Sequence, residues 1–222
     1  MVLAGYESTA ATLAWAWYLL SQAPEVETRL HSEIDQVLAG RPPVFADVDK
    51  LVYTRSIVEE TMRLYPPVAS TSREAVRDDS FNGTPVPKGS IILVVSWLLH
   101  RHKKLWRNPD HFMPERFLPG SDEPVSKFAY IPFGIGPRIC TGMAFGLTET
   151  ILCIATMAQQ FQFRLKAGHR VDPQCRLTLR PGETLPMSLQ RRNPPQALTR
   201  DSAPVAAVAC PFGHGSLEQV HP

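Results

Sequence analysis

The chain has 222 residues, of which 44% are hydrophobic and 20% are charged, and its formal net charge is +2. This composition excludes a wholly disordered chain, and the charges form no sustained Lys/Arg stripe of the kind that binds nucleic acid. The length is sufficient for one sizeable hydrophobic core. The 21 prolines predict long irregular connections between a few helices.

Cysteine usage and the apolar segments indicate where the protein works. The four cysteines include no close C-x-x-C pair, which is typical of a reducing compartment, so we expect a cytoplasmic location. We expect no secretory signal peptide, because a charged start and a small-residue cleavage site are both lacking, and the apolar run over residues 10–20 is too short to span a bilayer. The sequence enters an apolar helical pattern at Met1 without an N-cap residue, so we expect further chain upstream.

Helical patterns dominate the first third of the sequence. We expect helices over residues 2–20, 25–39 and 53–65, and a short helical turn over 47–51. Pro24 suits the first turn of the second helix, and Gly40 is expected to close that helix. The pair Pro66-Pro67 stops the third helix.

After residue 68 the pattern changes to short extended runs. Asn82-Gly83 predicts a tight hairpin turn, and residues 91–95 predict a buried strand. A Pro-rich meander with little periodicity follows over 107–132, and such a length inside a compact domain is usually functional. The other expected elements are helices over 96–99 and 142–160 and strands over 161–165, 176–179 and 187–189. This order predicts a mainly α fold with small β-sheets.

The densest chemical signal is the segment from Phe133 to Gly142, which reads FGIGPRICTG. An isolated cysteine is most often a small core residue. Here two glycines and a proline predict a tight, rigid loop, and a long helix follows, so the positive helix end lies near the sulfur of Cys140. Such surroundings favour the thiolate, which is a soft, strong axial ligand for iron.

The same segment resembles the haem-binding signature of the cytochrome P-450 family, F-x-x-G-x-R-x-C-x-G, at every defined position. The resemblance implies that Cys140 is the proximal ligand of the haem iron and that Phe133 packs near it. It also implies that Arg138 pairs with a haem propionate, while Gly136 and Gly142 permit the turn and the close approach of the helix.

Two further motifs support the resemblance. Glu60 and Arg63 form an E-x-x-R pair, which by itself is most simply a solvated surface pair of little energetic value. Downstream, Arg116 lies in the segment PERF of the meander. The resemblance implies that the three residues form a buried triad that fixes the meander and keeps the cysteine loop rigid.

The segment AGYEST over residues 4–9 lies inside the first predicted helix. Its hydroxyls could simply bond to their own backbone carbonyls. It also resembles the oxygen-activation motif of the family, in which small residues leave room for dioxygen and an acid-alcohol pair relays protons. The residues that match are Ala4 and Gly5 as the small pair, Glu7 as the acid, Ser8 in place of the usual threonine, and Thr9 beside it.

Three weaker signals remain. By its position, Arg73 resembles a family residue that can meet a propionate. His100 and His102 could belong to a solvated turn. Cys210 and His214, with two ligands only, are too few for a metal site.

The resemblance covers about residues 1–190, and we expect a haem-enzyme region over 1–192 and a disordered, Pro/Ala-rich tail over 193–222. It implies a monooxygenase that binds haem, uses O2 and an apolar small molecule, and takes electrons from a ferredoxin or a flavoprotein reductase driven by NAD(P)H. No nucleic-acid partner and no membrane span are expected. The alternatives are a peroxide-using haem-thiolate enzyme and a non-catalytic fragment without haem. We also expect the chain alone to bind haem poorly.

Overall fold

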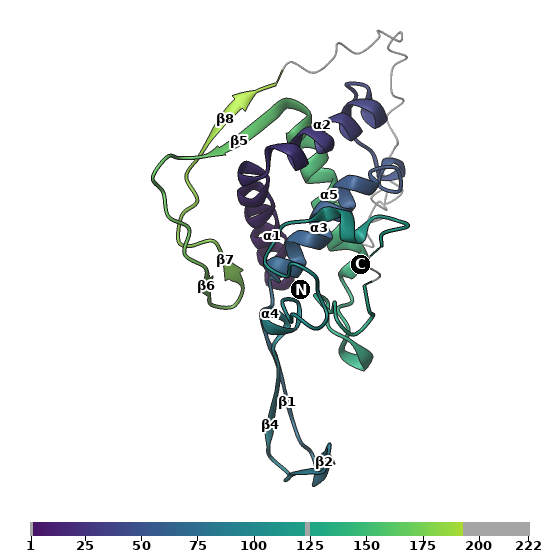
Figure 1. Ribbon diagram of the computed structural model, residues 1–222, viewed down its shortest axis with the longest axis vertical. Helices are drawn as coiled ribbons and strands as arrows, with labels where there is room; N and C mark the ends of the chain where they lie inside the picture. The colour runs from purple at the N-terminus through teal and green to yellow at the C-terminus, as the bar shows by residue number, and fades with distance from the viewer. Residues whose placement is uncertain (1, 123–124, 193–222) are drawn as a thin grey trace, which may run out of the picture.

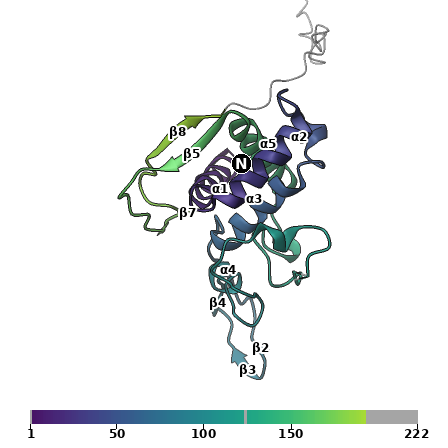
Figure 2. The same cartoon turned by 45° about the horizontal axis from the view of Figure 1, so that its top comes forward.

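The computed structural model describes residues 2–122 and 125–192. Four helices form its centre, and each contacts the other three (Figures 1 and 2). They are α1 (Val2–Gln22), α2 (Pro24–Leu38), α3 (Val52–Leu64) and α5 (Met143–Gln160). The short helix α4 (Ser96–Leu99) and the 3-10 turns η1 (Phe45–Asp47), η2 (Pro114–Phe117) and η3 (Gly136–Arg138) lie in the connections.

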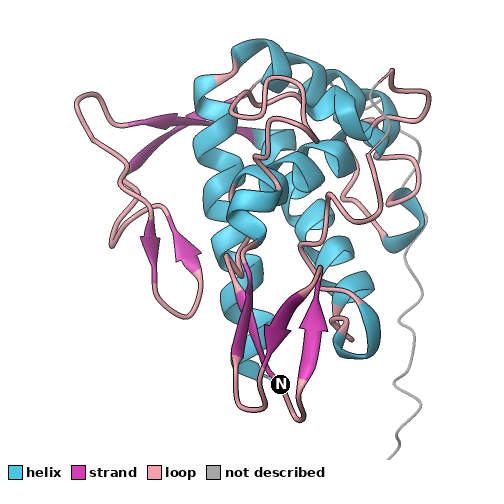
Figure 3. Ribbon diagram, turned by 60° about the horizontal axis from the view of Figure 1, so that its bottom comes forward, coloured by secondary structure: helices cyan, strands magenta, loops and turns pink. Residues whose placement is uncertain are grey.

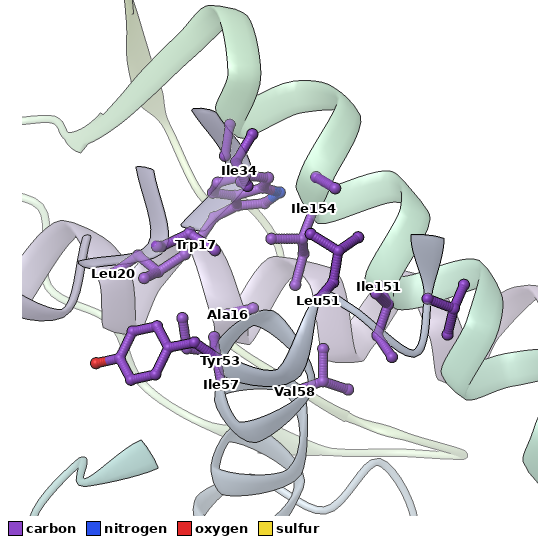
Figure 4. Close-up of a cluster of buried hydrophobic side chains, with 14 of the residues drawn as sticks. Ala16, Trp17, Leu20, Ile34, Leu51, Tyr53, Ile57, Val58, Ile151 and Ile154 are labelled. Carbon is purple, nitrogen blue, oxygen red and sulfur yellow. The ribbon is translucent and has the colours of Figure 1, made fainter. Parts of the chain in front are cut away.

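The buried core lies where the four helices meet. Figure 4 shows Trp17 and Leu20 of α1 beside Ile34 of α2 and Ile154 of α5. Trp17 also stacks on Phe163 of the following strand, with ring centroids 4.1 Å apart. Full burial of each large aliphatic side chain contributes about 1.5–3 kcal/mol, so this cluster is the main source of stability.

The strands of the described residues form four small antiparallel pairs. They are β1 (Thr71–Glu74) with β4 (Ile91–Val94), β2 (Asp79–Phe81) with β3 (Thr84–Val86), β5 (Phe161–Leu165) with β8 (Met187–Arg191), and β6 (Gln174–Cys175) with β7 (Leu179–Arg180). Asn82 and Gly83 join β2 to β3 with φ of 48° and 77°, the geometry that a tight hairpin turn requires. The fold is therefore mainly α with small β-sheets, as predicted.

Several expected elements are confirmed to within a few residues, and four are wrong in detail. The strand β4 exists, but it is not buried: Ile91 and Leu93 are both 63% exposed, because the β1–β4 pair projects away from the helices (Figures 1 and 3). Of the strand expected over 176–179, residues 176–178 form the turn between β6 and β7, and only Leu179 lies in a strand. Ala39, not Gly40, is the left-handed C-cap of α2. The helical turn expected over 47–51 lies earlier, as η1.

No described helix has both the length and the apolar character needed to cross a membrane. The tail expected over 193–222, and with it the pair Cys210 and His214, lies outside the described residues.

Candidate functional site

The cysteine loop is closed by backbone hydrogen bonds. The Cys140 N–H donates to the Phe133 carbonyl at 2.9 Å, and the Ile139 N–H donates to the Gly136 carbonyl at 3.1 Å. Gly136 has a φ of 75°, a conformation that side-chain-bearing residues rarely adopt. Gly142, the N-cap of α5, has an ordinary φ of −89°, and a Cβ there would lie 3.8 Å from the Cys140 sulfur. The loop therefore needs a glycine at 136 but not, within this chain, at 142.

The thiol and the guanidinium of the loop are both exposed to solvent. Cys140 is exposed, as is Arg138 on the same loop. Exposed apolar side chains flank them, including Ile139 at 46% and Phe145 at 71%. A soft thiol, an adjacent guanidinium and an apolar surface fit haem, which presents an iron, carboxylates and a flat apolar macrocycle.

Glu60, Arg63 and Arg116 lie together in the interior. The Glu60 carboxylate accepts from Arg63 Nε at 2.7 Å, from Arg63 Nη2 at 2.8 Å and from the Met113 N–H at 2.9 Å. Arg116 Nε donates to the same carboxylate at 3.4 Å. All three side chains are almost fully buried, so the solvated-pair alternative does not apply. Burial raises the pKa of Glu60, and its bonds to Arg63 oppose that shift.

Arg63 connects this cluster to the rest of the meander. Besides its two bonds to Glu60, the guanidinium donates to the backbone carbonyls of His100 at 2.8 Å, Pro109 at 2.6 Å and His111 at 3.0 Å. These five bonds use all five guanidinium N–H groups. A lysine has only three donors and could not replace them.

On α1 the predicted acid and alcohols are held by nearby groups. The Glu7 carboxylate accepts from the Arg180 guanidinium of β7 and from Thr178 Oγ1 at 3.2 Å. Thr9 Oγ1 donates to the Gly5 carbonyl at 3.0 Å, which is the local backbone bonding expected as the alternative. The Ser8 carbonyl accepts from a hydroxyl one turn later. Nothing is described for the side chain of Ala4.

Among the weaker candidates, Arg73 and His100 have opposite solvent exposure. Arg73 is exposed on β1, and its Nη1 donates to the carbonyl of Ser72 beside it. His100 is 0% exposed, so the solvated turn is wrong for this residue, whereas His102 is exposed as expected. The apolar residues before His100 could not have indicated its burial, because several of them are themselves exposed, including Leu98 at 64%.

The described residues thus combine a glycine-containing loop that exposes a thiol and an arginine with a buried Glu-Arg-Arg cluster. A family model described as cytochrome P450 matches residues 1–186. The chain belongs to the cytochrome P450 family, in which a cysteine thiolate ligates haem.

Individual relatives agree with this assignment. The chain is 39% identical over 182 residues to cyclooctatin synthase of Streptomyces melanosporofaciens, which covers 82% of this chain and 40% of that protein. It is 41% identical over 167 residues to cyclooctat-9-en-7-ol 5-monooxygenase of the same organism, covering 75% and 36%. Cytochrome P450 3A6 of Oryctolagus cuniculus is 38% identical over 166 residues, covering 74% and 33%. The chain thus spans at most two fifths of the length of these relatives.

Proposed function

We propose that this chain is the ligand-bearing part of a haem-dependent monooxygenase, which inserts one oxygen atom of O2 into an apolar small molecule. The observation that carries the proposal is the loop that presents Cys140 outward, with Arg138 and apolar side chains around it. Family membership supports it. Bound haem would supply the activation of dioxygen, for which thiolate ligation is suited.

The chain's own residues have separate parts in this proposal. Cys140 holds the iron, Phe133 packs near it, and Arg138 meets a carboxylate of the macrocycle, with Arg73 as a second candidate for that contact. Gly136 permits the loop to turn, as its φ of 75° supports. Glu60, Arg63 and Arg116 hold the meander in place beneath the loop.

Proton delivery is assigned to α1. Glu7 is the acid and Ser8 the alcohol, with Thr9 beside them and Gly5 as a small neighbour. Arg180 and Thr178 bond to the Glu7 carboxylate and fix its position on α1.

The substrate class and the electron donor are also proposed. The name of one relative describes it as a monooxygenase acting on cyclooctat-9-en-7-ol. A compound of mostly hydrocarbon character fits the apolar substrate that we propose for this chain.

Electrons would come from a ferredoxin or flavoprotein reductase, driven by NAD(P)H, on the face of the cysteine loop. The three described cysteines are all free, in keeping with a cytoplasmic location.

We further propose that the 222-residue chain alone binds haem weakly. The surface around Cys140 is open, since most residues from 135 to 145 are exposed. A cofactor held against one open surface is stabilised by fewer contacts than one enclosed on both faces.

The test is the haem and iron content of the polypeptide isolated from its native source. We expect haem to co-purify, and we expect the 222-residue chain, expressed alone, to retain much less of it. Absence of haem from the native polypeptide would refute the proposal and favour a non-catalytic role. Glu7→Gln separates the enzymatic alternatives: a monooxygenase loses reductase-driven turnover and keeps peroxide-driven turnover, whereas a peroxide-using enzyme is unaffected.

A further inference from the structure

His100 is a buried imidazole that the proposed chemistry does not use. It follows α4, is 0% exposed, and its Nε2 accepts the backbone N–H of Ile131 at 2.9 Å. Nε2 must therefore carry a lone pair, which in a neutral ring places the proton on Nδ1. Burial lowers the pKa of His100 to about 4, so the ring is neutral near pH 7.

Ile131 is the residue at which the meander enters the cysteine loop. Its carbonyl accepts the Gly134 N–H at 3.0 Å, which forms the turn that contains Phe133. The Phe133 carbonyl in turn accepts the Cys140 N–H at 2.9 Å. The Ile131 N–H, which bonds to His100, therefore lies two residues before Phe133, whose carbonyl accepts the bond that closes the loop.

The backbone of His100 is bonded to the buried Glu60–Arg63 pair. Its carbonyl accepts Arg63 Nη1 at 2.8 Å, and Arg63 is bound at two points to Glu60. The His100 ring also lies against the ring of Tyr130, with centroids 5.4 Å apart, and the Tyr130 hydroxyl donates to the Glu59 carbonyl of α3 at 3.0 Å. Tyr130 is thus bonded directly to α3, and Ile131 is connected to α3 indirectly, through His100 and Arg63.

We propose that His100 is a positioning residue, which transmits the position of the buried Glu60–Arg63 pair to the Cys140 loop through its bond to the Ile131 N–H. The inference rests on the proposed function only in taking haem iron as the ligand of the Cys140 loop. The effect of His100 on the position of the loop does not depend on haem and can be measured in its absence.

Two side chains of different reach test the bond. In His100→Gln the amide oxygen lies as many bonds from Cα as Nε2 does, so it can accept the Ile131 N–H. In His100→Asn the oxygen is one bond closer to the backbone and falls short. The matched control is His102→Asn, because His102 is exposed and lies only two residues away.

The readout is amide hydrogen exchange at Ile131 and Cys140, with the amide of Ile154, in the core of α5, as the reporter of global opening. We expect His100→Asn to speed exchange at Ile131 and Cys140 about tenfold relative to Ile154, as loss of one buried hydrogen bond predicts. His100→Gln should restore most of the protection, and His102→Asn should leave it unchanged.

Three outcomes would overturn the inference. One is equal acceleration at all three amides in His100→Asn, which indicates general destabilisation. The second is acceleration at Ile131 without acceleration at Cys140, which means that the bond holds the meander and not the loop. The third is a glutamine variant that behaves like the asparagine variant. Since no haem is present in these experiments, a failure of haem binding would refute the proposed function and leave this result unaffected.

Discussion

The buried cluster around Glu60 and the loop around Cys140 adjoin in structure and differ in almost every physical property. Glu60 and Arg63 are 0% exposed and bonded on all sides, whereas Cys140 and its neighbours are open to solvent. The first region is completed by residues of this chain. The second presents its polar and apolar groups outward, where no other described residues cover them.

The difference shows how a reactive surface can be kept in one shape without being buried. The loop is held from beneath, through the backbone of the meander, so its exposed groups need no contacts with one another. Substitutions in the cluster should therefore affect folding, and substitutions of the exposed side chains of the loop, such as Cys140, should affect only what the loop binds. The predictions below test this separation.

The largest effect should come from Arg63→Ala. Removal of one partner leaves the Glu60 carboxylate buried without its main counter-ion, which typically costs about 3–5 kcal/mol. Urea unfolding of the chain measures it. Arg55→Ala, on the same helix, is the control, because Arg55 pairs with an exposed Asp49 at 3.8 Å and should change stability by no more than about 0.5 kcal/mol. A loss below about 1 kcal/mol for Arg63→Ala would contradict the distinction between the two regions.

The second prediction concerns the dependence of the free energy of unfolding on pH. Since the pKa of His100 falls from 6.5 when unfolded to about 4 when folded, the unfolded state binds the extra proton between these values. Stability is thus fully present above pH 6.5 and declines as pH falls toward 4, by about 3 kcal/mol for this residue. Arg63 of α3 and the adjacent Arg101 also disfavour protonation, and uncharged Tyr130 faces the ring.

The measurement is unfolding free energy against pH for the native chain and His100→Gln. The subtraction removes contributions from other groups, including His31, whose pKa is also lowered to about 4. The difference between the two proteins should change by about 3 kcal/mol between pH 7 and pH 4. Parallel curves would mean that the ring is not held neutral.

A smaller effect should distinguish two glycines of the loop. Gly136→Ala places a side chain at a φ of 75°, which costs about 1–2 kcal/mol even though nothing lies within 4 Å of the added Cβ. Gly142→Ala has a φ of −89° and an ordinary contact, so stability should stay within about 0.5 kcal/mol. Thermal unfolding compares the two. Equal losses would refute the conformational explanation.

The smallest effect should come from Cys140→Ser in the haem-free chain. An exposed side chain contributes little to stability, so the free energy of unfolding should change by less than about 0.5 kcal/mol. Urea titration is sufficient to measure it. A loss of about 2 kcal/mol or more would show that the thiol helps to hold the fold.

The sequence predicted the central helices well because their apolar periodicity and their proline boundaries are local signals. It failed for β4, since a run such as Ile91-Ile92-Leu93-Val94 indicates burial but not whether the covering surface belongs to the same chain. Strands β6 and β7 have two residues each, too few for a periodic pattern.

For the site, the motifs located the cysteine loop and the Glu60, Arg63 and Arg116 cluster, because their residue types and spacing are specific. His100 was missed since a histidine that is followed by Arg101 and His102 gives no local indication of burial. Its bond to Ile131 joins positions 31 residues apart, and only the folded meander brings them together.

The most direct test of the account is to replace the proposed iron ligand, Cys140, and to purify the variant polypeptide with its haem. Cys140→Ser should abolish the long-wavelength absorption of the ferrous–carbon monoxide complex that thiolate ligation produces, whereas Cys153→Ser, a half-buried cysteine of α5, should retain it. Survival of that absorption in Cys140→Ser would contradict the claim that this sulfur binds the iron.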